Sequence, residues 1–259
     1  MAGRENCHSY NGYKKMKIDI AEDYHSLTAF YPVYSFSGHL LAVEVMTHYM
    51  HKSANVAIPQ EILFPQMTFE QQLTLLKNQI NVIEKYHDFF IHHQLHVGIK
   101  IDEQLAWAIL ESEFLLHKMG TFTYLELELS ESLADFSLGR NNPLLAELSE
   151  RFFLSLGNFG AGKAPAKAVY DNLFYRIKLD KGFIQHNITR PSFFPFMNAI
   201  LNNISPHCQQ IIVQGIDDLP MMEKVRPLGF SGIQSSLFRP VGEESLPALI
   251  YPPQEFFGG

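Results

Sequence analysis

The chain has 259 residues, of which 46% are hydrophobic and 18% charged, so it can form a folded core and is neither disordered nor collagen-like. Its 20 Lys and Arg against 27 Asp and Glu give a net charge of −7, which lacks the basic footprint of a nucleic-acid-binding protein. We therefore expect proteins or small molecules as partners, and no direct contact with nucleic acid.

Cysteines and apolar runs indicate the cellular context. Cys7 and Cys208 are the two cysteines, too few for a disulfide framework and typical of a reducing cytoplasm. No run approaches about 18 apolar residues, the length of a membrane span, and the first residues carry Arg4, Lys14 and Lys15 without an apolar stretch. The sequence predicts a cytoplasmic protein without signal peptide or membrane contact.

The chain begins with a polar segment without hydrophobic period, so we expect a loosely ordered leader over residues 1–24. Residues 25–259 are expected to form a single domain, because no linker rich in Gly, Pro or Ser divides them. The first predicted elements are strands at 29–36 and 39–46, joined by a turn at Ser37-Gly38.

A long helix is predicted over residues 69–90, because seven apolar residues recur there three or four apart. Farther along, short apolar runs alternate with helical patterns such as the one over residues 103–119. These apolar runs, each predicted to be a strand, are 95–101, 122–129, 151–156, 175–179, 209–216 and 232–238.

Alternation of strands and helices with a period of about 30 residues favours a mostly parallel sheet covered by helices, an α/β fold. The chain has six or more such units. The predicted architecture is therefore a (β/α)8 barrel.

Residues 157–163 match the phosphate-binding pattern G-x-x-x-x-G-K and follow an apolar strand. A P-loop places a hydroxyl residue after the lysine to hold Mg²⁺, but here Ala164 occupies that position and Pro165 follows. We interpret the segment as a glycine-rich turn between a strand and a helix.

Four histidines lie near the end of the long predicted helix: His87, His92, His93 and His96. His92 and His96 are four residues apart and would share one helix face. Zinc needs three or four ligands in closed geometry, and no cysteine or acidic residue recurs at finger spacing. We expect solvated histidines at a helix end, and no metal site.

Acidic residues lie near the ends of successive predicted strands, and strand ends in a barrel converge on one mouth. Such a cluster would suggest hard-cation catalysis on a phosphate ester. The alternative is that acidic residues begin loops because they are well solvated there. The residues concerned are Glu44, Glu128, Glu131, Asp180 and Asp217.

Segments in chain order resemble motifs of the EAL domain family, the cyclic di-GMP phosphodiesterases. Glu44-Val45-Met46 stands where the family has Glu-Ala-Leu, and ELSES (128–132) is similar to Glu-Ile-Thr-Glu-Ser. LGNFGAG (156–162) stands for Leu-Asp-Asp-Phe-Gly-Thr-Gly. IKLDKGFI (177–184) is similar to Ile-Lys-Ile-Asp-Arg-Ser-Phe.

Three further segments, IKID (99–102), VQGID (213–217) and GFSGIQSSLFRP (229–240), resemble family motifs as well. The resemblance covers roughly residues 25–240 and rests on several motifs in order. It implies a modified TIM (β/α)8 barrel with one antiparallel strand.

Active members of the family hold one or two Mg²⁺ or Mn²⁺ ions with Glu, Asn, Glu and paired Asp residues, and a Lys orients the attacking water. The resemblance places Glu44, Glu128 and Lys178 at matching positions. At the family's other catalytic positions, the resemblance places these residues of the chain: Lys100, Gly157, Asn158, Gln214, Asp217 and Gln234.

These departures imply that no metal or other cofactor is bound and that phosphodiesterase activity is absent. An ammonium at Lys100 would repel a divalent ion and could instead form an ion pair with Glu44 or Glu128. The family's phosphate-binding Arg is here His48, which lacks the planar donor fork, and the Gly after Gln234 is Ser235. We expect weak or no binding of cyclic di-GMP.

Within the family, the residues at positions 46–49, 156–162 and 179–185 are most similar to those of a degenerate, non-catalytic subgroup. This subgroup is of the YdiV type, the anti-FlhDC factors. This resemblance implies a protein that binds FlhD, a subunit of the flagellar master activator, and represses flagellar genes and motility. The alternatives are a weak metal-dependent phosphodiesterase that uses Glu44, Glu128 and Lys178, and a sensor that binds cyclic di-GMP without cleaving it.

Overall fold

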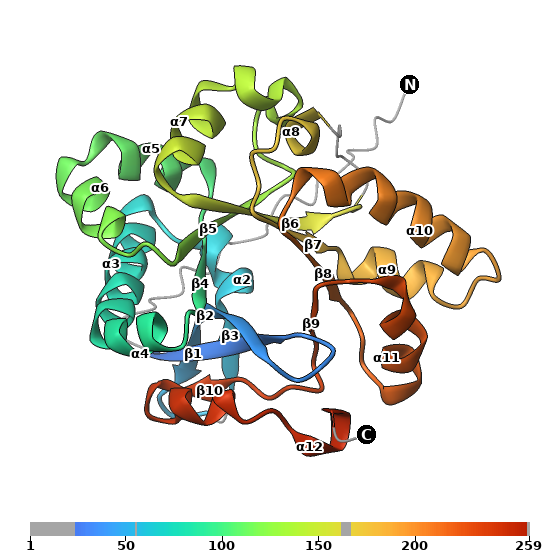
Figure 1. Cartoon of the computed structure of the whole chain (residues 1–259). Helices are drawn as coiled ribbons and strands as arrows, with labels where there is room; N and C mark the ends of the chain where they lie inside the picture. Colours follow the sequence, from blue (N-terminus) through green and yellow to red (C-terminus); the bar gives the residue numbers. More distant parts are fainter. Residues whose placement is uncertain (1–23, 55, 162–166, 258–259) are drawn as a thin grey trace, which may run out of the picture.

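The computed structural model describes residues 24–54, 56–161 and 167–257, and these form an α/β barrel (Figure 1). The predicted leader lies almost wholly outside the described residues, as does Cys7, so the boundary between residues 24 and 25 stays a prediction. The ring consists of β1 (Tyr24–Tyr34), β2 (Leu40–His51), β4 (His96–Lys100), β5 (Leu125–Ser130), β6 (Phe153–Phe159), β7 (Arg176–Leu179), β8 (Gln210–Gln214) and β9 (Gly232–Gln234).

The ring closes because β1 pairs with β2 on one side and with β9 on the other. Both of these pairings are antiparallel, and every other pairing in the ring is parallel. The predicted modified barrel is therefore confirmed. Two short strands outside the ring, β3 (Ala57–Pro59) and β10 (Val241–Gly242), also pair antiparallel, so the expectation of one antiparallel strand holds for the ring alone.

Helices surround the strands on the outside of the barrel (Figure 1). Those that follow the first half of the ring are α2 (Gln60–Leu63), α3 (Phe69–Lys85), α4 (His87–His92), α5 (Glu103–Glu111), α6 (Glu113–Gly120) and α7 (Pro143–Arg151). The remaining helices are α8 (Lys167–Tyr170), α9 (Lys181–Asn187), α10 (Phe193–Ile204), α11 (Leu219–Val225) and α12 (Gln254–Phe257). Short 3-10 turns connect them: η1 (Phe64–Gln66), η2 (Phe136–Asn141), η3 (Ser205–His207), η4 (Arg226–Leu228) and η5 (Glu243–Ile250).

Two long helices predicted from the sequence are each divided in the structure. The pattern over 69–90 breaks at Tyr86, whose φ of −106° and ψ of 17° leave the helical region, so α4 begins anew after α3. The pattern over 103–119 breaks at Ser112, whose side chain caps α6 by accepting from the Leu115 N–H at 3.2 Å. Apolar spacing alone continues across both breaks, so it does not reveal them.

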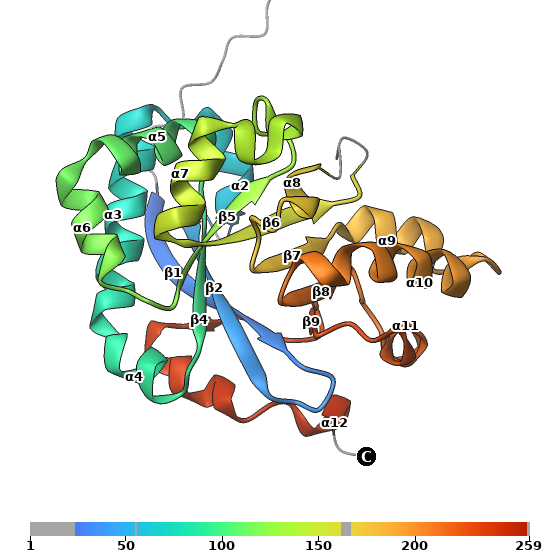
Figure 2. The ribbon, with the colours of Figure 1, turned by 45° about the horizontal axis from the view of Figure 1, so that its top comes forward.

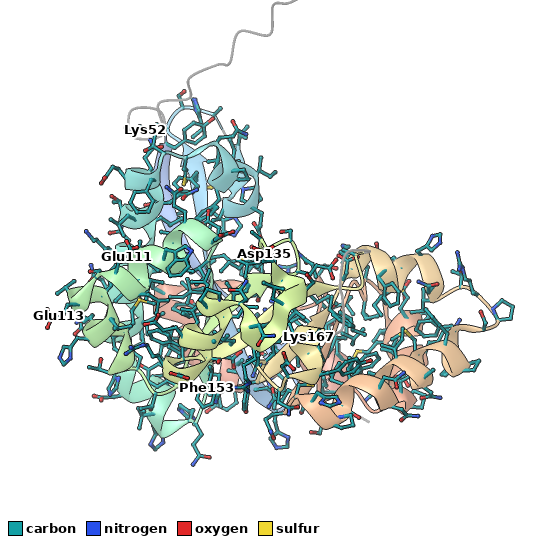
Figure 3. The ribbon with its side chains drawn as sticks, turned by 90° about the horizontal axis from the view of Figure 1, so that it is seen from above. Lys52, Glu111, Glu113, Asp135, Phe153 and Lys167 are labelled. Atoms are coloured by element: carbon teal, nitrogen blue, oxygen red, sulfur yellow. The ribbon has the colours of Figure 1, made fainter. Side chains whose placement is uncertain are left out.

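The main core lies between the ring and the helices, because parallel strands bury both faces. A separate small cluster of Tyr49, Leu63, Met67 and Leu75 packs where the β1–β2 arm meets α2 and α3. Figure 3 shows this arm, with Lys52 at its end, projecting from the rest of the barrel. Within the described part of the chain, no helix has both the length and the hydropathy needed to cross a bilayer.

Candidate functional site

Charged residues inside the barrel form two separate clusters, because side chains two apart on a strand share a face. Glu126 and Glu128 alternate in this way on β5, and Arg176 and Lys178 do so on β7. The mouth cluster, at the carboxyl ends of the strands, consists of Glu44, Lys100, Glu128 and Lys178. The base cluster, at the opposite end, consists of His96, Glu126, Arg176 and Gln210.

The mouth cluster is a closed set of ion pairs between two carboxylates and two ammoniums. Lys178 Nζ lies 2.9 Å from Glu44 Oε2 and also contacts Glu128. Lys100 Nζ lies 3.0 Å from Glu44 Oε1 and 3.9 Å from Glu128 Oε1. Three of the four side chains are almost fully buried, and Lys100 is 34% exposed. The ion pair of Lys100 with Glu44 that the sequence suggested is present.

Two amides and a third carboxylate extend this cluster. Gln214 Nε2 donates to Gln234 Oε1 at 2.8 Å, and Gln234 Nε2 donates to Glu44 Oε2 at 2.7 Å. On the solvent side, Glu61 of α2 accepts from Lys100 Nζ at 3.3 Å. Glu44 is thus contacted from β4, β7 and β9, and its two oxygens face donors.

The charges of the cluster stabilise one another. Burial alone would raise the pKa of the Glu44 carboxyl, but Lys100 and Lys178 outweigh burial and hold this pKa well below its usual range. Burial would likewise lower the pKa of Lys178, yet the neighbouring Glu128 and Glu44 raise it above the ordinary lysine value. Glu44 and Lys178 are therefore both ionised at neutral pH.

Gly157 faces Glu128 with no room for a side chain. A Cβ at Gly157 would lie 2.5 Å from Glu128 Oε1, so Glu128 occupies the space that a side chain at this position would need. The next residue, Asn158, has a left-handed φ of 57° and is exposed. Both line a cavity of about 380 Å³ that also reaches Lys100. Positions 162–164 of the glycine-rich motif lie outside the described residues.

The arrangement offers no free carboxylate pair to a cation. Glu44 accepts from an amide and lies beside two ammoniums, so a divalent ion could reach its oxygens only by displacing these groups. Within the described residues, no group of three or more His, Cys, Asp or Glu side chains is placed to hold a metal ion. The chemistry of this site is that of a neutralised ion network.

Two further acidic residues at strand ends make contacts outside the four-residue cluster. Asp217 accepts from Ser236 Oγ and Gln185 Nε2, each at 2.6 Å, and the Ser236 hydrogen bond holds the pKa of Asp217 below its usual value. Asp180 caps α9 by accepting from the Phe183 N–H at 2.7 Å. Each of the two therefore contacts the loop or helix that follows its strand, as the alternative explanation for acidic residues at strand ends expects. Glu131 is buried just past the end of β5.

The histidine prediction was wrong for His96. It is the first residue of β4, and its Nδ1 lies 2.6 Å from Glu126 Oε1 inside the barrel, so it shares no helix face with His92. His87 Nδ1 is 2.9 Å from the Tyr124 hydroxyl. His48, at the family's arginine position, bonds the Tyr31 hydroxyl and stacks on that ring at 5.8 Å.

Sequence reasoning missed the base cluster entirely. Arg176 Nη1 lies 2.9 Å from Glu126 Oε1, and Arg176 Nε and Nη2 donate to Gln210 Oε1 at 3.1 and 2.8 Å. Arg176 and Glu126 are 2% and 1% exposed. The available signal was the alternation of charged with apolar residues in LELEL and RIKL, since interior strands are otherwise apolar.

Comparisons with known proteins find relatives over most of the chain. The family model described as EAL domain matches residues 18–240. The anti-FlhC(2)FlhD(4) factor YdiV of Salmonella typhimurium is 35% identical over 235 residues, which are 91% of this chain and 99% of that relative. The putative factor of the same name in Escherichia coli K12 shows the same identity and coverage.

Solved structures give the same result at the level of the fold. The crystal structure of the EAL-like domain protein YdiV is similar with a TM-score of 0.80 and 34% identity, covering 90% of this chain and 99% of that one. The PaMucR phosphodiesterase in complex with c-di-GMP has a TM-score of 0.64 at 18% identity, covering 85% and 94% of the two chains, which shows a shared fold.

Proposed function

The chain belongs to the EAL domain family, and from this premise we propose that it is a non-catalytic member that binds FlhD and represses flagellar gene expression and motility. The observation that carries the choice of partner is the 35% identity to the anti-FlhC(2)FlhD(4) factor YdiV over 99% of that relative. The proposal includes a cytoplasmic location, because a transcription activator acts where the DNA is.

The mouth cluster supports the non-catalytic part of the proposal. In a metal-dependent phosphodiesterase, Glu44 and Glu128 would have to face a divalent cation, whereas here each faces ammonium groups. Two unit charges 4 Å apart interact by about 4 kcal/mol at an effective dielectric of 20, so a divalent ion beside Lys100 would meet repulsion of about twice that. Mg²⁺ also demands near-octahedral oxygen ligands, and the residues present do not supply them.

Replacement of metal by ammonium leaves the barrel intact as a scaffold. The two lysines supply the positive charge that the buried carboxylates need, so the mouth keeps its shape without an ion. The outer surface is then available for a protein partner. On this proposal, the family's reaction centre has become a structural element and the biological activity is binding.

Size-exclusion chromatography of the chain mixed with purified FlhD at micromolar concentration tests the partner. We expect co-elution, and separate elution would overturn the proposal. Incubation with cyclic di-GMP and Mn²⁺ tests the loss of catalysis, and we expect no hydrolysis. Turnover that disappears in the Glu44→Ala variant would instead identify a phosphodiesterase.

A further inference from the structure

The outer edge of β1 is only partly paired. Along this edge β9 pairs with Tyr34, and β10 pairs with Ala29 and Phe30. Among the described residues, no strand pairs with Tyr24–Thr28 on this side, although β2 pairs with the same residues on the other. About half of β1 therefore has no strand partner on this side within the part of the chain that the structure describes.

Register shows which backbone groups this edge presents. The His51 N–H donates to the Val56 carbonyl at 3.0 Å, so the backbone polar groups of His51 point away from β1. His51 is the Cα partner of Tyr24, and this pair is therefore not hydrogen-bonded. By alternation along the strand, Tyr24, Ser26 and Thr28 direct their N–H and C=O groups outward.

A groove runs along this edge between β1 and α3, which lie beside each other in Figure 2. It consists of two adjoining cavities of about 360 and 740 Å³ that share Ser26, Thr28 and Asn78. The smaller cavity also reaches Thr47 and Tyr49 of β2, so it covers part of the face of the β1–β2 pair, and the larger one lies beside β10. On the α3 side, uncharged polar side chains recur at positions i, i+3, i+7 and i+10, namely Gln71, Thr74, Asn78 and Asn81. The apolar Leu75 and Val82 and the charged Glu70 and Lys85 of the same helix also line the groove.

Such a groove suits a polypeptide backbone. Amide and hydroxyl side chains both donate and accept hydrogen bonds, and the open edge of a sheet binds extended peptides by adding them as a strand. The larger cavity lies beside β1 directly beyond the end of β10 at Gly242. An added strand would thus extend the sheet from the point where β10 stops.

Charge selects the occupant. Glu70 lies at one end of the groove, and Glu243 and Glu244 lie at the other. Lys85 is the one lysine or arginine among the described lining residues, and it is paired with Glu243 at 3.0 Å. Three carboxylates against one ammonium leave two negative charges in excess, which favours a segment that carries lysine or arginine.

We propose that this groove binds an extended, basic segment of the protein partner as an added strand along Tyr24–Thr28. The inference rests on the proposed function in one respect, that the chain acts by binding a protein. The recognition itself follows from the open edge, the polar side chains of α3 and the acidic ends of the groove.

Two probes separate this inference from the choice of partner. The first is a nine-residue peptide of alternating lysine and valine, with a glutamate–valine peptide as its charge control. The second is full-length FlhD. We expect the lysine peptide, and not the glutamate peptide, to slow hydrogen exchange of the Ser26 and Thr28 amides. If FlhD fails to bind while the lysine peptide still protects these amides, the inference about the groove is supported and the proposed partner is wrong.

Ser26→Pro removes an outward N–H and keeps the ladder to β2, so it should weaken binding of the lysine peptide by about tenfold. Ser26→Ala keeps the N–H and should bind as the unmodified chain does. Glu244→Lys changes a charge away from the Ser26 amide. This variant should bind the lysine peptide more weakly and the glutamate peptide more tightly than the unmodified chain does. Circular dichroism checks that each variant is folded.

Four outcomes would overturn the inference. One is the absence of protection by the lysine peptide, and another is equal binding of the Ser26→Pro and Ser26→Ala variants. Slow exchange at Ser26 and Thr28 in the free, dilute chain would mean that another segment of the chain occupies the edge. Protection that grows with the concentration of the chain itself, together with dimer formation, would assign the edge to a second copy.

Discussion

The two ionic clusters inside the barrel differ in how they neutralise buried carboxylates. At the base, one guanidinium binds Glu126 and its planar fork is fixed by Gln210, with both charges at most 2% exposed. At the mouth, two ammoniums serve two carboxylates as point charges, and Lys100 remains 34% exposed. A guanidinium holds fixed angles, whereas an ammonium does not.

On the proposed function, this difference separates a structural site from a former reaction site. The mouth of a TIM barrel is the face where catalysis takes place, and the opposite face contributes to stability. Here the carboxylates at the mouth are also neutralised by buried cations, but the ion pairs are less fixed in angle and Lys100 is partly exposed to solvent. We interpret it as a catalytic face that has acquired a structural role, and substitutions at the two ends should have effects of different size.

The largest effect is expected at the base. Arg176→Met leaves Glu126 buried with His96 as its remaining partner of the cluster, and removing one partner of a buried ion pair costs about 3–5 kcal/mol. Urea unfolding followed by circular dichroism should show a loss of this size in the free energy of unfolding. The double variant Arg176→Met/Glu126→Gln should regain part of the loss, and a single-variant loss under about 1 kcal/mol would contradict this account.

Lys178→Met should have the next largest effect. Lys178 is 3% exposed and contacts both mouth carboxylates, but Lys100 still neutralises Glu44 when it is absent. We expect a loss of about 3 kcal/mol, the lower end of the range for a broken buried pair. Lys181→Met, at an exposed neighbouring lysine, is the control and should change stability by less than about 0.5 kcal/mol. Equal losses in the two variants would refute the role of Lys178.

Much of the fold could be predicted because hydrophobic period reports burial directly. The hairpin at Ser37-Gly38 and the parallel order of most strands were expected from the pattern and are present. One antiparallel strand in the ring was implied by the family resemblance, and it is β1. The helix breaks at Tyr86 and Ser112 were not predicted, because the apolar stripe continues through both. His96 lies in the predicted strand 95–101 and begins β4, so its spacing of four residues from His92 had no helical meaning.

The mouth cluster was only partly predictable, for reasons of register. Motif positions gave Glu44, Glu128 and Lys178, and the substitution at Lys100 suggested its ion pair. Which charges meet depends on the stagger between strands, which a single sequence does not contain. Glu61 lies in a short helix with no motif of its own, so its contact with Lys100 could not be foreseen.

Lys100→Met should have a smaller effect than either buried substitution. Lys100 pairs with Glu44 at 3.0 Å, but water screens its exposed part and Lys178 still neutralises Glu44. After this discount we expect a loss of about 1 kcal/mol in the free energy of unfolding, seen as a lower melting temperature. Glu61→Gln, which removes the exposed partner of Lys100, should cost less. No change in melting temperature for Lys100→Met would mean that this ion pair does not stabilise the mouth.

The smallest effect is on how the free energy of unfolding depends on acidic pH. It tests the mouth cluster separately, because it follows the ionisation of Glu44. The pKa of Glu44 is lower in the folded chain than in the unfolded one, since Lys100 and Lys178 outweigh burial. The stability that Glu44 contributes is therefore complete above about pH 4.3, the ordinary value for Glu, and is lost as the pH falls below it. One such group changes stability by at most about 1.4 kcal/mol per pH unit.

Lys100→Met removes one of the two charges that depress the pKa of Glu44, so the folded and unfolded values move closer together. The variant should then lose stability less steeply below pH 4 than the unmodified chain, with a difference under about 1 kcal/mol per pH unit. Urea unfolding at intervals from pH 3 to pH 6 measures both slopes, and Lys181→Met supplies a control with the same change in net charge. Parallel slopes for the unmodified chain and Lys100→Met would show that Lys178 alone sets the ionisation of Glu44, and the mouth would then be as strongly fixed by one cation as the base is.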